Sequence, residues 1–94
     1  MTEQEDIIVV KVLKAKSGKS MIQYGIKDKV NNFSKGVTIL SQWFDDSRAY
    51  DNIPNELMLK PLKAITHYEP GFDGKATKKL DDLFDENGIS LLAK

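Results

Sequence analysis

The stretch HYEPGFDGK, residues 67–75, gathers the residue types from which catalytic sites are built. It holds the only histidine of the chain, followed by the carboxylates Glu69 and Asp73. In an extended strand His67 and Glu69 share a face, and a histidine beside a carboxylate is a pair that general acid–base catalysis uses. The chain has no second histidine and no cysteine, and its serines lie in no nucleophile-elbow motif. We therefore expect no enzyme, no metal site and no cofactor.

The same stretch also fits a hairpin turn that presents aromatic side chains. Pro70-Gly71 suits a type II turn, and Asp73-Gly74 supplies a second position that tolerates a positive φ. Phe72 would then stand at the tip of the hairpin, with Tyr68 before it and Lys75 behind it. An aromatic side chain at a loop tip either folds back on the core or meets a partner, and the sequence leaves both alternatives open.

The charges of the chain are arranged in blocks, although 14 cations balance 14 anions. Residues 11–41 and 60–79 are net basic, whereas residues 1–10, 42–59 and 80–94 are net acidic. All but one of the cations are lysines, which suit diffuse attraction to phosphates better than bidentate reading of bases. The alternative is that the lysines only solvate the outer faces of strands and protect sheet edges.

Binding of single-stranded nucleic acid needs a cationic groove and aromatic side chains on which bases stack. Trp43 belongs to this set only if it faces outward, because one of Trp43 and Phe44 must face the interior of a regular strand. Tyr24 is expected in the core. The predicted nucleic-acid-binding residues are Lys14, Lys16, Lys19, Lys27, Lys29, Phe33, Lys35, Trp43, Tyr68, Phe72 and Lys75.

Alternation of apolar and polar residues predicts a mostly β chain. The first two strands should form a hairpin through the turn SGKS, which lacks the earlier glycine of a phosphate-binding loop. Gly25 suggests a bulge or bend. One helical turn capped by Asp45 or Asp46 is expected after the third strand, and Pro61 argues for an edge or bulge in the fourth. The four expected strands cover residues 7–16, 21–27, 37–44 and 56–68.

Residues 76–88 permit two interpretations. Leu80, Leu83 and Phe84 have helical spacing, but in a helix the lysines would lie at its positive end and the acidic residues at its negative end. The extended alternative uses Asn87-Gly88 as a tight turn into residues 89–93. We favour a fifth strand on this ground.

Length and composition fit one small domain over residues 1–94, with residues 1–6 and 90–94 expected to be frayed or peripheral. The acidic start lacks the features of a secretory signal, and the longest apolar run, Ile7–Val10, is far too short to span a membrane. The absence of cysteine suits a reducing compartment. These features predict a cytoplasmic protein.

The order of strand, KSGKS turn, strand, loop, strand, partly helical connection and terminal hairpin over residues 7–84 resembles the small single-stranded-DNA-binding proteins of phages and plasmids. The resemblance implies a five-stranded OB-like barrel with a short helical turn after the third strand. It further implies binding of single strands on one barrel face, in a homodimer or higher oligomer.

We therefore predict a protein that binds single-stranded DNA without sequence preference and protects or organises it in phage or plasmid replication or transfer. The acidic C-terminal segment is a possible contact for replication proteins. The alternative is a protein-binding module of a mobile element that docks on a host protein through Trp43, Tyr50, Phe72 and the acidic patches.

Overall fold

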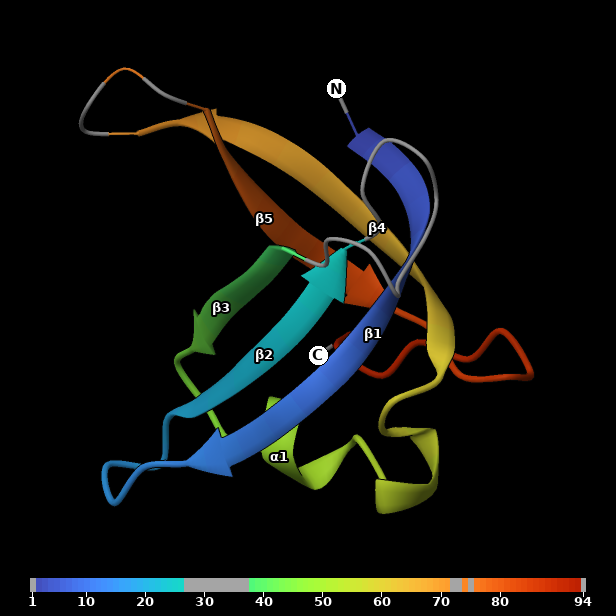
Figure 1. Cartoon of the computed structure of the whole chain (residues 1–94). Coiled ribbons are helices and arrows are strands. Elements are labelled where there is room, and N and C mark those ends of the chain that lie inside the picture. Colours follow the sequence, from blue (N-terminus) through green and yellow to red (C-terminus); the bar gives the residue numbers. More distant parts are fainter. Residues whose placement is uncertain (1, 27–37, 72–73, 75, 94) are drawn as a thin grey trace.

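The computed structural model describes residues 2–26, 38–71, 74 and 76–93. Five antiparallel strands form one sheet in the order β3-β2-β1-β4-β5, which curls into a half-barrel (Figure 1). The mostly β prediction is thus confirmed, as is the helical turn after the third strand, although the N-cap of this turn is Ser47 rather than Asp45 or Asp46. The strands are β1 (Thr2–Lys14), β2 (Ser20–Ile26), β3 (Thr38–Phe44), β4 (Pro61–Pro70) and β5 (Ala76–Leu83), and the connection after β3 holds α1 (Arg48–Asp51) and the 3-10 turn Asn55–Leu57.

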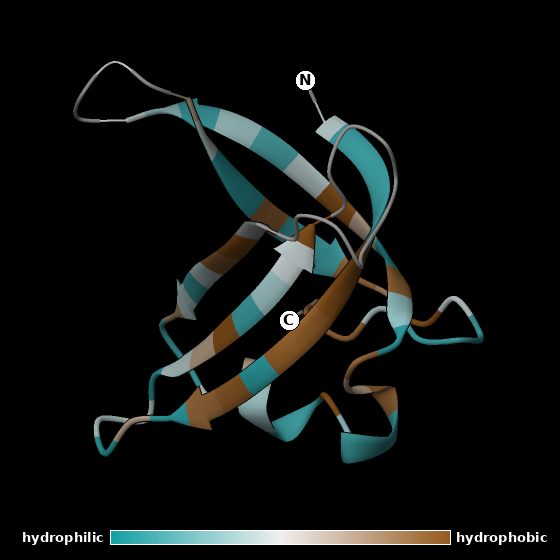
Figure 2. Ribbon diagram, viewed as in Figure 1, coloured by the Kyte–Doolittle hydropathy of each residue, from teal (hydrophilic) through white to brown (hydrophobic). Residues whose placement is uncertain are grey.

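Strand β1 is the longest and belongs to two ladders. Its first part pairs with β4 from Thr2 to Ile8, and its second part pairs with β2 from Ile7 to Lys14. A bulge lies between Val9 and Lys11. Bulges bend a strand and increase its twist, which lets β1 leave one ladder for the other. Figure 2 shows the matching change along β1, from a hydrophilic start to a hydrophobic middle.

The expected ends of the chain differ from those in the structure. Residues 2–6 were predicted to be frayed, but they pair with β4 from Lys63 to His67. The side chains of these residues are polar, so they show no alternation of apolar and polar residues that would predict a strand. The residues with which they pair are far away in the sequence. At the other end, Leu91 and Leu92 are buried in the core rather than peripheral. The strand predicted to continue to residue 16 ends at Lys14.

Strand β4 begins later than predicted, at Pro61, after the 3-10 turn Asn55–Leu57. Pro61 is thus the first residue of the strand, a position that tolerates the missing N–H. The bulge suggested at Gly25 lies instead on β1, across the ladder from this part of β2. Strand β2 pairs with β3 in regular register from Ser20 to Ile26.

Residues 76–83 form the predicted fifth strand. The turn after it also lies where expected, with Gly88 at φ 78°. Asp85 organises this turn, because its carboxylate accepts hydrogen bonds from the backbone N–H groups of Asn87 (2.8 Å) and Ile89 (2.9 Å). The return segment makes only a single β-bridge, between Phe84 and Ser90, before the chain enters the core.

The core fills the inner face of the curled sheet. Tyr24 lies there fully buried, as predicted, and burial raises the pKa of its hydroxyl to about 12, with further contributions from the charges of Glu5 and Asp81. The edge strands β3 and β5 approach one another through a side chain, since the Leu80 N–H donates to the Gln42 Oε1 at 3.3 Å. The buried apolar residues are Ile7, Val9, Met21, Ile22, Tyr24, Phe44, Ala49, Ile53, Leu57, Leu62, Ala64, Leu80, Leu83, Leu91 and Leu92.

No helix within residues 2–26, 38–71 and 76–93 has the length and apolar character needed to cross a membrane.

Candidate nucleic-acid interface

Trp43 lies on the outer face of the edge strand β3 with 54% of its surface exposed. Phe44, the next residue, is 7% exposed and belongs to the core. Successive side chains of a strand point to opposite faces, so Phe44 takes the inner position and the indole is left outside. The sequence could not decide between these two residues, and the structure gives Trp43 the orientation that stacking requires.

A row of apolar side chains crosses the outer face of the sheet and ends at Trp43. Leu13 on β1 pairs with Met21 on β2, and Met21 pairs with Trp43 on β3. Met21 is buried although it faces outward, because both neighbours in its row are large apolar side chains. Met21 therefore flanks Trp43 on the neighbouring strand, and 54% of the Trp43 surface remains exposed.

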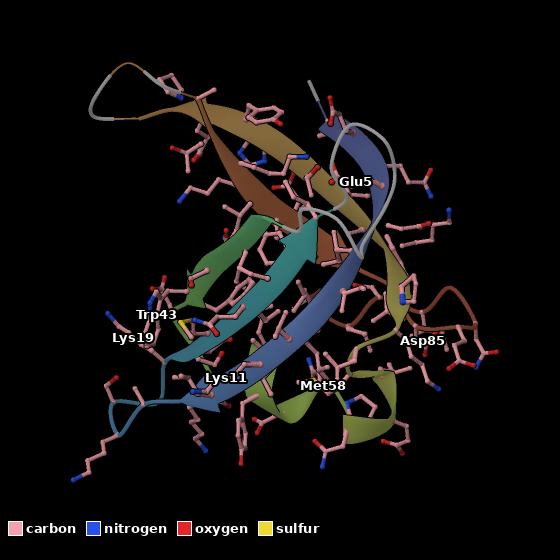
Figure 3. All side chains as sticks on the ribbon, viewed as in Figure 1. Glu5, Lys11, Lys19, Trp43, Met58 and Asp85 are labelled. Carbon is pink, nitrogen blue, oxygen red and sulfur yellow. The ribbon has the colours of Figure 1, made fainter. Side chains whose placement is uncertain are left out.

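Lysines surround the turn that joins β1 to β2, at the same end of the sheet. The turn is closed by hydrogen bonds from Ala15 N to Lys19 O (2.8 Å) and from Gly18 N to Ala15 O (3.0 Å). Lys14, Lys16 and Lys19 are exposed and form no ion pair with any described carboxylate. Figure 3 shows Lys19 beside Trp43 at this end of the molecule and Asp85 at the opposite side. We call the set Lys14, Lys16, Lys19 and Trp43 the basic end.

Three other lysines are neutralised locally. Lys60 pairs with Glu86 at 3.7 Å and Lys63 pairs with Asp6 at 3.1 Å. Lys78 Nζ lies 2.6 Å from the Glu5 Oε2. Apart from Lys79 on β5, the described lysines without an ion pair lie at or near the basic end. They include Lys11, which the sequence prediction omitted and which is exposed on β1 near the basic end.

Tyr68 does not join the basic end. It lies on β4 near the β4–β5 hairpin, which Figure 1 places far from the β1–β2 turn. The Lys78 Nζ lies 5.1 Å from the centroid of the Tyr68 ring, so a cation already occupies one side of this ring. The remaining predicted site residues, Lys27, Lys29, Phe33, Lys35, Phe72 and Lys75, are outside the described residues.

The predicted pair of His67 and Glu69 exists, with a second carboxylate that the sequence did not indicate. The Nδ1 atom of His67 lies 2.7 Å from the Asp81 Oδ2, and its Nε2 lies 3.4 Å from the Glu69 Oε1. Asp81 is the extra residue at the bulge of β5, two positions from Lys79, which pairs with His67 in register. Within the described residues no group of three or more histidine, cysteine or acidic side chains is arranged to hold a metal ion.

This histidine should make stability depend on pH. The hydrogen bonds to Asp81 and then to Glu69 raise the pKa of His67 above its ordinary value of 6.5. A raised pKa means that the contribution to stability is complete below the pKa of the unfolded chain and is lost as pH rises through the folded pKa. Urea unfolding from about pH 5 to pH 9 is expected to show stability falling over this window. His67→Gln should remove that step, and an unchanged profile in the variant would contradict the assignment.

The acidic C-terminal segment is largely used inside the fold. The Asp82 Oδ1 accepts hydrogen bonds from the Ser90 hydroxyl (2.6 Å) and from the Leu83 N–H (2.8 Å). Asp85 organises the following turn, as described above. Figure 3 shows Asp85 on the opposite side of the molecule from Lys19 and Trp43. No family model, curated protein or solved structure matches this chain.

Proposed function

We propose that this protein binds single-stranded nucleic acid, with DNA as the leading substrate, through the basic end and without sequence preference. The observation that carries the proposal is the outward indole of Trp43 beside a turn of unpaired lysines. Stacking on an aromatic ring is open to every base, and lysines attract phosphates irrespective of sequence.

The fold supports the same proposal. OB-folds are five-stranded, partly open barrels that bind oligonucleotides on the face of strands 2 and 3, beside the loops that join strands 1–2 and 4–5. We infer that the curled sheet with order β3-β2-β1-β4-β5 is an OB-like barrel. Trp43 then occupies strand 3, Lys14 ends strand 1, and Lys16 and Lys19 occupy the loop between strands 1 and 2.

The test is the fluorescence of Trp43, the only tryptophan, during titration with oligo-dT at several salt concentrations. We expect saturable quenching that weakens with salt, with a slope of log K against log salt of about −0.7 for each phosphate contacted. No quenching, together with no change in anisotropy of a labelled oligonucleotide at low salt, would reject the proposal.

Removing a single lysine should change the slope of log K against log salt by the amount expected for one phosphate contact. Lys14→Ala and Lys19→Ala are each expected to reduce the magnitude of this slope by about 0.7, because each lysine neutralises one phosphate. Their exposure predicts little effect on the free energy of unfolding. Lys60→Ala is the matched control, since this exposed lysine pairs with Glu86 away from the basic end. If all three variants have the slope of the wild type, Lys14 and Lys19 do not belong to the site.

Protein docking is the second candidate function. Ile39 and Trp43 are both exposed on the outer face of β3, and exposed apolar side chains on an edge strand suit a protein contact. Salt separates the two functions, because an aromatic-centred protein contact should vary little with ionic strength while phosphate binding should weaken steeply.

A further inference from the structure

Two adjoining hollows lie beside the second half of β1, and Tyr50 of α1 lines both. One measures about 530 Å³ and runs from Val10 to Val12 along β1, with Ile53, Pro54 and Met58 among its other walls. The other measures about 650 Å³ and runs from Val12 to Lys16. Tyr50 is 50% exposed. Together the hollows form a shallow groove along seven consecutive residues, which we call the Tyr50 groove.

The groove exists because β1 leaves the β4 ladder at Ile8. Beyond this point β1 keeps β2 on one side, while its other side has no strand partner among the described residues. The Leu59 N–H, which donates to the Val9 O at 3.0 Å, is the last described backbone contact on that side. The connection that carries α1 passes alongside and supplies the second wall.

The charge of its lining distinguishes this groove from two hollows that are lined by Asp85 and Glu86. Its charged lining residues are Lys11, Lys14 and Lys16, and no carboxylate lines it. Glu56 also lines one of these acidic hollows, which adjoins the Tyr50 groove at Pro54, and Lys63 lines the other. An apolar floor, a half-exposed aromatic ring and a lysine rim complement a polyanion that carries flat apolar groups.

Tyr50 is held on a fixed support. Ser20, which is fully buried on β2, donates to the Asp46 O at 2.6 Å and accepts from the Ala49 N–H at 3.2 Å. Arg48 donates from Nη1 to the Leu92 O at 3.1 Å and lies over the Phe44 ring. After Tyr50, the Asn52 side chain donates from Nδ2 to the Leu91 O at 2.9 Å. These contacts tie α1 to the core on either side of Tyr50, so little ordering is required when a base stacks on its ring.

One turn connects the two aromatic residues. Lys14 and Lys16 line the Tyr50 groove, and Lys19 of the same turn leads into Met21, the in-register partner of Trp43. We propose that Tyr50 is a second stacking platform and that one nucleic-acid strand passes from Trp43 around the lysines of the β1–β2 turn into the Tyr50 groove. This inference rests on the proposed function and assigns a role to Tyr50 that the predicted binding set did not contain.

The test compares two lengths of oligo-dT on the wild type, Tyr50→Leu and Tyr50→Phe. An oligonucleotide of about 4 nucleotides can occupy one platform, whereas one of about 12 can reach both. Tyr50→Leu is expected to lower affinity for the longer one about 5- to 150-fold, the equivalent of one lost stacking contact, and to leave quenching of Trp43 by the shorter one unchanged. Tyr50→Phe keeps a ring and should bind both like the wild type.

The outcomes separate this inference from the function on which it rests. If the wild type binds oligo-dT and Tyr50→Leu binds each length with the affinity of the wild type, Tyr50 is not a second stacking platform while the proposed function stands. If the wild type binds neither length at low salt, both are wrong. Thermal melting of each variant checks folding, and the half-exposed position of Tyr50 predicts a nearly unchanged melting temperature.

Discussion

Trp43→Ala is expected to weaken binding of oligo-dT by about 1 to 3 kcal/mol, or roughly 5- to 150-fold, because it removes the stacking surface at the basic end. Its effect on the free energy of unfolding should be small, since the indole lies outside the core. Anisotropy of a labelled oligonucleotide measures the affinity, because this variant has no tryptophan fluorescence, and urea unfolding measures the stability.

The neighbouring residue supplies the opposite control. Phe44→Ala should destabilise the fold by about 3 to 5 kcal/mol, because the ring is buried on the inner face. Trp43→Phe keeps an aromatic platform and should retain most of the affinity of the wild type. A large loss of stability in Trp43→Ala with unchanged affinity would identify the indole as a structural residue and contradict its role in binding.

The largest effect of an ionic substitution on stability is expected for Lys78→Ala. The side chain of Lys78 is only 8% exposed, and its Nζ lies 2.6 Å from the Glu5 Oε2, which also accepts a hydrogen bond from the Thr66 hydroxyl at 2.8 Å. Burial lowers the pKa of Lys78, but the hydrogen bond and the charge of Glu5 outweigh it, so the pKa is raised and Lys78 keeps its charge at neutral pH. The variant leaves Glu5 without its cation, which should cost about 2 to 4 kcal/mol.

A double-mutant cycle tests this pairing. Glu5→Ala together with Lys78→Ala should destabilise the protein by less than the sum of the single variants, with a coupling of about 1 to 3 kcal/mol in urea unfolding. Lys60→Ala removes an exposed partner of Glu86 and should cost less than about 1 kcal/mol. Additive effects of Glu5→Ala and Lys78→Ala would show that the two charges act independently.

The strands β2, β3 and β4 were predictable because each alternates or concentrates apolar side chains over a short window, whereas β5 was predicted from the unfavourable placement of its charges in a helix. The start of β1 was not, since Glu5 gains its cation from Lys78 on β5 and such a partner leaves no local pattern in the sequence. The bulge between Val9 and Lys11 was likewise hidden, because a continuous β-branched run does not show where pairing changes. Contacts between residues far apart in the sequence therefore determine the start of β1 and its bulge, which local alternation could not predict.

The candidate site was predictable in part for the same reason. The lysines around the SGKS turn follow from the sequence, because a tight turn keeps its flanking residues together. The outward position of Trp43 depends on its register with Met21. Trp43 and Phe44 are adjacent and both aromatic, so the sequence does not show which of them faces outward. Tyr50 lay in a short helical turn whose neighbours come from β1, far away in the sequence, so its place beside Lys14 and Lys16 needed the structure.

The shared strand β1 also constrains how the chain folds. Strands β1 to β3 and the pair β4 and β5 can each assemble from contacts between sequence neighbours, whereas the β1–β4 ladder closes a loop of about fifty residues between Ile8 and Pro61. Long-range closure of this kind slows folding and tends to come late. The first residues of β1 are therefore expected to pair late in folding and to lose their pairing early in local unfolding. Amide hydrogens along Thr2–Asp6 should exchange faster than those of the β1–β2 ladder.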